Sequence, residues 1–116
     1  MDWKPTFYTS AGGNEPVKDF ILAQPDAAVA EILHVLKLLR LFNVTLGMPH
    51  SRKVTDNLRE LRIQHGSDHY RILYCAIPER RFLLLHGLTK KADKLNESDI
   101  ETAEKRLAEY SNRGGL

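Results

Sequence analysis

Three consecutive runs of strand-forming residues, at positions 58–64, 70–77 and 81–88, limit the fold of this chain more than any other feature. The connections between them are short and contain Gly66 and Pro78. Short connections join antiparallel strands, because parallel neighbours need a long crossover. The runs therefore predict an antiparallel meander. The last two runs are apolar on both faces, which places them at the centre of the sheet.

A short strand and two helices are predicted ahead of the meander. Residues 3–8 mix aromatic side chains with Thr and precede two adjacent glycines, as expected for a strand and a turn. Pro16 suits the first turn of a short helix, and Asp26 is placed to cap the N-terminus of a second helix. Apolar residues recur at helical spacing in the second helix, at Val29, Ile32, Leu33, Leu36 and Leu39. We expect the helical pair to pack its apolar side against the sheet.

The rest of the chain completes an α+β arrangement. Residues 43–56 contain Gly47, Pro49 and other turn formers, which predicts a long loop. Asn96 is placed to start a final helix, with acidic residues in its first turn, where the helix dipole favours them. The buried side of this helix is marked by Ile100, Ala103, Leu107 and Tyr110. We expect one domain, residues 1–116, in which an N-terminal strand and helical pair pack on an antiparallel sheet with a C-terminal helix.

Positive charge is concentrated in the segment that carries the predicted sheet. Residues 50–95 hold ten Lys or Arg, four of the five His and only five acids, a net charge of +5 with His neutral. Residues 1–49 carry −1 and residues 96–116 carry −2, so the whole chain has only +2. The total charge says little about partners, but a positive field on one part of a sheet attracts phosphate.

Five cations lie on the predicted strands or soon after them, namely Arg62, Arg71, Lys90, Lys91 and Lys94. Arg62 lies on the polar face of the first strand, Arg71 lies near the start of the second, and Lys90 and Lys91 come directly after the third. If these groups meet, guanidinium groups can hold a phosphate, and crowding lowers the pKa of a lysine toward neutrality. RNA cleavage needs little more, since the 2′-hydroxyl of the RNA is the nucleophile. The spacing alone does not decide whether the strand ends meet.

Plainer interpretations of these residues stay open. Two adjacent lysines before a helix are typical of a solvated loop. Arg62 and Glu60, two residues apart on one face, fit a surface ion pair of little energetic value. Arg71 is harder to explain in this way, because it shares a face with Leu73 and Cys75 in a central strand, where a charge needs a reason.

The remaining candidate groups favour neither metal nor cofactor chemistry. His65 and His69 flank a hairpin turn, and His86 lies on a strand face where a hydrogen-bonded core histidine is expected. The single cysteine, Cys75, fits a small buried hydrophobe. No metal-ligand spacing and no glycine-rich phosphate loop occurs, so we expect no metal and no cofactor. The sequence has neither a secretory signal nor an apolar run of membrane-spanning length, which predicts a cytoplasmic protein without a membrane partner.

An ordered set of short motifs resembles one known family. The motifs are Pro16-Val17-Lys18-Asp19-Phe20-Ile21, Leu46-Gly47-Met48-Pro49, Leu58-Arg59-Glu60-Leu61-Arg62-Ile63, Asp68-His69-Tyr70-Arg71-Ile72-Leu73-Tyr74, Leu83-Leu84-Leu85-His86-Gly87 and Lys90-Lys91 with Lys94. They cover about residues 14–110 and resemble the HigB toxins of the phage-derived branch, which belongs to the RelE superfamily. Relatives often carry Thr-Gln before the third lysine, whereas this chain has Ala92-Asp93.

The resemblance implies a RelE-like fold and a ribosome-dependent mRNA endoribonuclease that needs no metal. It implies the toxin of a type II toxin-antitoxin pair, with mRNA on the ribosome and a helix-turn-helix antitoxin of the HigA kind as partners. Carried over by motif, the implied working residues are Arg62, Arg71, Lys90, Lys91 and Lys94. We predict catalytic roles for Arg62, Arg71, Lys90 and Lys91, and RNA contacts for Arg59, His69, His86 and Lys94. Two alternatives remain, a non-catalytic RNA-binding module and a protein-interaction domain that uses the same basic patch.

Overall fold

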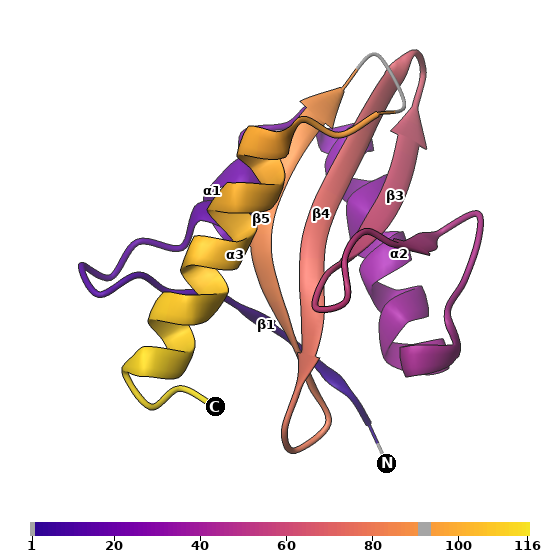
Figure 1. The fold of residues 1–116 in the computed structure, drawn as a ribbon. Coiled ribbons are helices and arrows are strands. Elements are labelled where there is room, and N and C mark those ends of the chain that lie inside the picture. The colour runs from indigo at the N-terminus through magenta and orange to yellow at the C-terminus, as the bar shows by residue number, and fades with distance from the viewer. Residues whose placement is uncertain (1, 91–93) are drawn as a thin grey trace.

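The molecule is built on a mixed sheet, shown in a computed structural model that describes residues 2–90 and 94–116 (Figure 1). The strands of the described chain are β1 (Lys4–Phe7), β2 (Ser51–Lys53), β3 (Arg59–His65), β4 (Asp68–Ile77) and β5 (Arg81–Lys90), in the order β1-β5-β4-β3-β2. β3, β4 and β5 form the predicted antiparallel meander, with β4 and β5 in the interior of the sheet as expected. β1 adds to β5 in parallel, so the sheet is not purely antiparallel.

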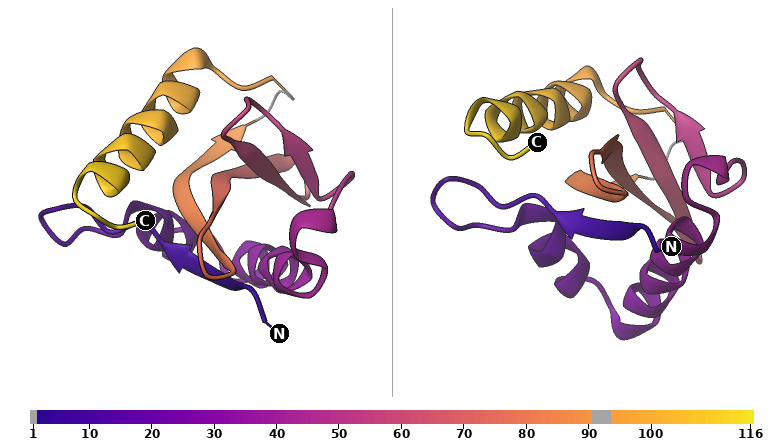
Figure 2. Two further views of the ribbon diagram at one scale, coloured as in Figure 1. Left: turned by 60° about the horizontal axis from the view of Figure 1, so that its bottom comes forward. Right: turned by 90° about the horizontal axis from the view of Figure 1, so that it is seen from below.

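Helices cover both faces of this sheet (Figure 2). α1 (Pro16–Leu22) and α2 (Asp26–Phe42) lie on one face, and α3 (Glu97–Asn112) lies on the other. Pro16 is the first residue of α1, where its missing N–H breaks no helical hydrogen bond. The predicted α+β class and the order of its elements are therefore confirmed.

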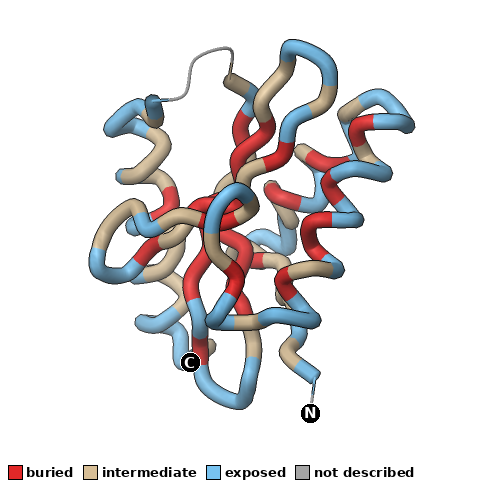
Figure 3. Tube along the Cα trace, turned by 90° about the vertical axis from the view of Figure 1, so that its right-hand side faces the viewer, coloured by how far each residue is buried: buried red, intermediate tan, exposed pale blue. Residues whose placement is uncertain are grey.

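Each face of the sheet carries its own apolar core, and Figure 3 shows buried residues along the strands and on the inner sides of the helices. The core under α1 and α2 includes Val17, Ile21, Ile32, Val35, Leu39, Leu61, Ile63, Tyr70, Ile72, Tyr74, Phe82 and Leu84. The core under α3 includes Tyr8, Leu58, Leu73, Cys75, Ile77, Leu83, Leu85 and Ala103. Ile100, Leu107 and Tyr110 are partly buried against this second core, as predicted.

Two details of α2 differ from the sequence prediction. Leu33 is 53% exposed, and Val35 is buried in its place. Successive residues of a helix turn by about 100°, so Leu33 falls off the stripe that contains Ile32 and Val35. Asp26 is the first helical residue rather than the N-cap, because the carbonyl of Pro25 already accepts the N–H of Val29 at 2.9 Å.

The predicted long loop over residues 43–56 contains regular structure. A 3-10 turn, η1 (Asn43–Thr45), follows α2, and β2 pairs antiparallel with the start of β3. The loop prediction was wrong for β2 because three residues are too few to show alternation. β2 is fixed by tertiary contacts instead, since Ser51 is buried and its hydroxyl lies 2.6 Å from the Tyr74 hydroxyl.

Candidate functional site

The register of β3, β4 and β5 brings the predicted cations onto one face of the sheet. Arg62 lies directly opposite Arg71, and His69 lies directly opposite Lys90. Cross-strand partners project from the same face, and so do residues two apart in one strand. Arg62, Arg71, His69 and Lys90 therefore share the face that α3 partly covers. The sequence left open whether the cations meet, and the register places Arg62, Arg71 and Lys90 on one face. The chemical roles of these residues stay a prediction.

The cluster is organised around a buried acid, Glu60. The Glu60 side chain has no exposed surface, and its Oε1 atom lies 2.7 Å from a terminal nitrogen of Arg62 and 2.8 Å from one of Arg52. The Nε atom of Arg71 lies 3.8 Å from the same oxygen. The surface ion pair considered for Arg62 and Glu60 is therefore wrong, since the Arg62 side chain is only 16% exposed. We call Arg52, Glu60, Arg62 and Arg71 the arginine cluster.

Arg71 is the most deeply placed cation of the cluster. It is among the largest fully buried side chains, and one of its terminal nitrogens donates to the Tyr70 carbonyl at 3.1 Å. The sequence predicted partial burial from the apolar neighbours of Arg71 in β4, and the structure confirms the burial. A guanidinium buried this deeply is held in one orientation by its hydrogen bonds and by the opposed carboxylate.

A second group of polar side chains links β5 to the first turn of α3. Asp99 accepts from His86, with 2.8 Å between Oδ1 and Nε2, and its Oδ2 lies 3.9 Å from the Lys90 ammonium. Arg106 donates to the Leu85 carbonyl at 2.8 Å and lies 3.4 Å from Nδ1 of His86. Arginine only donates and a carboxylate only accepts, which assigns the proton of neutral His86 to Nε2. His86 is thus hydrogen-bonded at both ring nitrogens.

Burial also affects the pKa of Arg106, the neighbour of His86. Desolvation lowers the pKa of the Arg106 guanidinium, and the nearby Tyr8 phenol opposes that shift. The pKa of Tyr8 is raised in turn, first by desolvation and then by its hydrogen bond to Glu109. The hydrogen bonds of Tyr8 to Glu109 and of Arg106 to the Leu85 carbonyl join α3 to the rest of the fold.

The predicted lysines have different positions. Lys90 is the last residue of β5, and its side chain is only 14% exposed, so the solvated-loop interpretation is wrong for Lys90. Lys91 lies outside the described residues. Lys94 is exposed ahead of α3 and is not part of the arginine cluster.

Arg59 lies away from the cluster. It is opposite Tyr74 in the register of β3 and β4, on the face that packs against α2, and its Nε donates to the Ser51 hydroxyl at 3.0 Å. The structure therefore does not bring Arg59 together with Arg62 and Arg71. Its predicted RNA contact would have to be a separate one.

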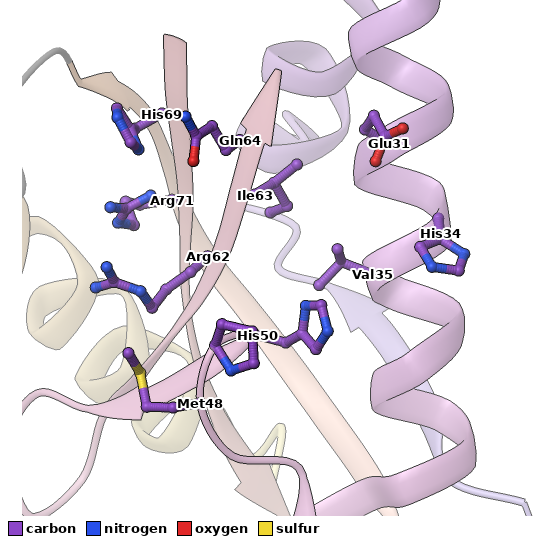
Figure 4. A pocket seen from close by; sticks show the side chains of 11 residues that line it. Glu31, His34, Val35, Met48, His50, Arg62, Ile63, Gln64, His69 and Arg71 are labelled. Carbon is purple, nitrogen blue, oxygen red and sulfur yellow. The ribbon is translucent and has the colours of Figure 1, made fainter. Parts of the chain in front are cut away.

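A cavity of about 340 Å³ opens beside the cluster at the edge of β3 (Figure 4). Arg62, Arg71 and His69 lie on one side of β3, whereas Glu31 and His34 project from α2 on the other side. The remaining lining residues are Val35, Met48, Pro49, His50, Ile63 and Gln64. The cavity gives solvent access to the arginine cluster from the edge of the sheet.

Sequence reasoning missed three members of this region. The sequence predicts a polar strand face and a surface ion pair with Arg62 for Glu60, and a loop for Arg52. Asp99 is one of the acidic residues expected in the first turn of the final helix. Glu60 carried a usable signal, because it shares a strand face with Arg62 and a predicted partner strand contains Arg71. Arg52 carried none, since the pairing of β2 with β3 depends on tertiary contacts.

The described residues form neither a metal-ion cluster nor a membrane-spanning helix. Within residues 2–90 and 94–116, no group of three or more His, Cys, Asp or Glu side chains is arranged to hold a metal ion. None of the helices in the described part of the chain has the length and apolar character needed to span a bilayer.

The fold and the site together define a small α+β protein with a buried arginine and glutamate cluster on one face of a mixed five-stranded sheet. A family model described as Phage derived protein Gp49-like (DUF891) matches residues 19–108, and the chain belongs to this family. The family lies within the RelE and toxin-antitoxin-like group, which confirms the sequence resemblance at that level. Membership is consistent with the toxin of a toxin-antitoxin system. No curated protein matches the chain.

Proposed function

We propose that this protein is a HigB-type toxin, a metal-independent and ribosome-dependent endoribonuclease that cuts mRNA and stops translation. The observation that carries the proposal is the placement of Arg62 directly beside Arg71, with Lys90 on the same face of the sheet. Phosphodiester cleavage needs cations at the point where negative charge develops. Membership of the Gp49-like family supports a toxin, and the sequence resemblance supports the HigB type.

Arg62 and Arg71 would grip the scissile phosphate. Guanidinium groups bind phosphate oxygens through paired N–H donors, and burial strengthens the interaction because little water competes. Both side chains are held before substrate arrives, so little reorganisation is needed when a pentacoordinate phosphorus forms. The arrangement stabilises the extra negative charge of that state.

The reaction itself uses groups of the RNA. The 2′-hydroxyl loses its proton to a base and attacks phosphorus, and the bond from phosphorus to the 5′-oxygen breaks as that oxygen receives a proton. The products are a 2′,3′-cyclic phosphate and a 5′-hydroxyl end. Lys90 or Lys91 would serve as the proton-transfer group or as an electrostatic stabiliser, and Lys90 is already oriented by Asp99.

The proposed partners are mRNA in a translating ribosome and a helix-turn-helix antitoxin of the HigA kind. Family membership within the toxin-antitoxin-like group supports an antitoxin partner in general terms. The ribosome and the HigA type rest on the sequence resemblance to HigB toxins.

The direct test is induction of the protein in bacteria with and without the gene next to its own, followed by mapping of transcript 5′ ends. We expect growth arrest without the neighbouring gene, new 5′-hydroxyl ends inside translated frames, and rescue when both genes are expressed. Normal growth at good expression would contradict the proposal. RNA binding that weakens with salt but leaves every transcript intact would identify a non-catalytic RNA-binding module instead.

A further inference from the structure

Glu60 is an unexpected residue at a site proposed to bind phosphate. A carboxylate beside the arginines repels the anion that they are meant to hold, and it reduces the positive charge of the cluster by one. Its full burial adds a cost, because a charged group loses its hydration unless cations replace the water. A residue that weakens anion binding and is expensive to bury needs a compensating role.

The geometry around Glu60 indicates what that role is. One oxygen, Oε1, contacts Arg62 at 2.7 Å and Arg52 at 2.8 Å, and it faces Nε of Arg71 at 3.8 Å. These guanidinium groups come from three neighbouring strands, β2, β3 and β4. The Glu60 carboxylate therefore contacts or faces guanidinium groups from all three strands.

The other carboxylate oxygen of Glu60 is a second acceptor close to the arginines. Glu60 Oε2 is buried and makes no hydrogen bond to the part of the chain that the structure describes. A buried carboxylate oxygen of this kind can accept a further N–H donor from the guanidiniums around it. Glu60 can thus keep hold of the arginines both before and after a phosphate enters.

The ion pair with Glu60 also places Arg52 at the cluster. Its side chain is 41% exposed, the most accessible of the three arginines, and β2 places it opposite Glu60 on the face of the cluster. Exposure falls from Arg52 through Arg62 at 16% to Arg71 at 2%. The three guanidiniums thus lie at increasing depth, from the solvent-exposed Arg52 to the buried Arg71.

We infer that Glu60 is a positioning residue that fixes Arg52, Arg62 and Arg71 as one clamp for the phosphodiester backbone of single-stranded RNA, with Arg52 as the solvent-facing contact. This inference rests on the proposed RNA-cleaving function. According to this inference, Glu60 increases the rate of cleavage and does not increase the affinity for RNA.

The decisive variant is Glu60→Gln, which keeps the shape of the side chain and removes its charge. If Glu60 positions the arginines, this variant should cleave mRNA on programmed ribosomes about 100-fold more slowly. A misplacement of a reacting group by about 1 Å has an effect of this size. The extra positive charge predicts that affinity for a non-cleavable 2′-O-methyl RNA strand stays equal or increases. Cleavage within threefold of the unmodified protein, or loss of affinity in proportion to the loss of rate in a folded variant, would overturn the inference.

Asp56→Asn is the matched control. Asp56 is 97% exposed and pairs with Lys53 at 3.2 Å, so its substitution removes the same charge from the same part of the chain without touching the cluster. We expect its cleavage rate to stay unchanged. A loss of cleavage as large as that of Glu60→Gln would mean that overall charge, and not position, matters.

Glu60→Asp decides the question if Glu60→Gln does not fold. Aspartate keeps the buried charge but withdraws the carboxylate by one methylene, so we expect a folded protein that cleaves at least 10-fold more slowly. Cleavage at the unmodified rate would overturn the inference.

A measurement without RNA separates this inference from the proposed function. Fixed guanidiniums should give dispersed Nε–H signals in ¹H–¹⁵N spectra, and these signals should collapse in Glu60→Gln and Glu60→Asp. If the unmodified protein cuts no RNA, the proposed function fails while this result still reports on positioning. Signals that do not change in either variant would refute the positioning role itself.

Discussion

Arg71 is a charged residue in the interior of the protein. Its side chain is almost completely buried in an interior strand, yet it carries a charge that water would hydrate strongly. The Tyr70 carbonyl and the Glu60 carboxylate face two parts of its planar guanidinium. A buried charge held in this way is costly to keep for stability alone, because apolar residues of similar volume often stabilise as well or better.

Replacing Arg71 with lysine tests the geometry of this group at constant charge. Lysine offers a compact ammonium in place of the planar fork, so it cannot repeat the same set of directed donors. We expect Arg71→Lys to fold and to cleave mRNA about 100-fold more slowly, the typical effect of removing one transition-state donor. Arg81→Lys, the same change at the far end of β5, is the control for the substitution itself. Equal cleavage by both variants would remove Arg71 from the site.

The sequence identified Arg71 but not its counter-ion, and the reason lies in how the two signals arise. Arg71 stands out because its own strand surrounds it with apolar neighbours, which is local information. Glu60 looks ordinary because alternation places it beside Arg62 on a polar face, as in any half-exposed strand. The burial of Glu60 depends on which residues of β2 and β4 lie next to it. The residue spacing within one strand does not specify the register of the neighbouring strands.

Cys75 behaves as the sequence predicted, and its burial has a measurable consequence. Burial raises the pKa of the Cys75 thiol from its ordinary value of 9.0 to about 11. The folded state therefore holds the proton more tightly than the unfolded state. This stabilisation is fully present below pH 9 and is lost as the pH rises toward 11, by up to about 2 to 3 kcal/mol at 1.4 kcal/mol per pH unit.

We expect the free energy of unfolding to fall more steeply between pH 9 and pH 11 in the unmodified protein than in Cys75→Ala. Urea unfolding at four pH values across this range measures the difference. Other groups that titrate there, such as Tyr8, are present in both proteins and cancel in the comparison. Parallel curves would show that the thiol does not titrate differently in the folded state.

At the scale of secondary structure, the elements with strong local patterns were predictable and the others were not. The meander and the three α-helices follow from periodicity and turn residues within continuous stretches. β2 is three residues long and depends on the Ser51 to Tyr74 contact, so no local pattern could reveal it. The parallel pairing of β1 with β5 joins the first and the last strand in the sequence. No short-range sequence signal specifies that pairing.

The packing of α1 on β5 depends on a glycine, and this gives a test at the scale of elements. A Cβ atom at Gly87 would overlap the ring of Phe20. Gly87→Ala should force α1 away from the sheet and lower the free energy of unfolding by about 1 to 3 kcal/mol. Gly47→Ala is the control, since nothing lies within 4 Å of that position. Equal unfolding midpoints for the two variants would contradict the close packing.

The helices divide the sheet into covered and accessible regions. α1 and α2 close one face, while α3 covers only part of the other and leaves the arginine cluster beside a cavity (Figures 1 and 4). The charge count over residues 50–95 points to the sheet region as a whole, and it includes cations that are not part of the arginine cluster. Arg80 and Arg81 contributed to that count, although they lie at the opposite end of β5 from Lys90, roughly 30 Å away at 3.3 Å per residue.

This separation of charge within one molecule leads to a test of where RNA binds. Each phosphate neutralised by a cation releases counter-ions, so the logarithm of affinity for a single strand falls with the logarithm of salt by about 0.7 per contact. Arg62→Gln should reduce that slope by about 0.7, because it removes a cation from the clamp. Arg80→Gln removes the same charge from the hairpin between β4 and β5 and should leave the slope unchanged. Titration of a 2′-O-methyl RNA strand between about 50 and 200 mM salt measures both. If the two variants change the slope equally, RNA responds to the total charge of the protein and the arginine cluster is not its binding face.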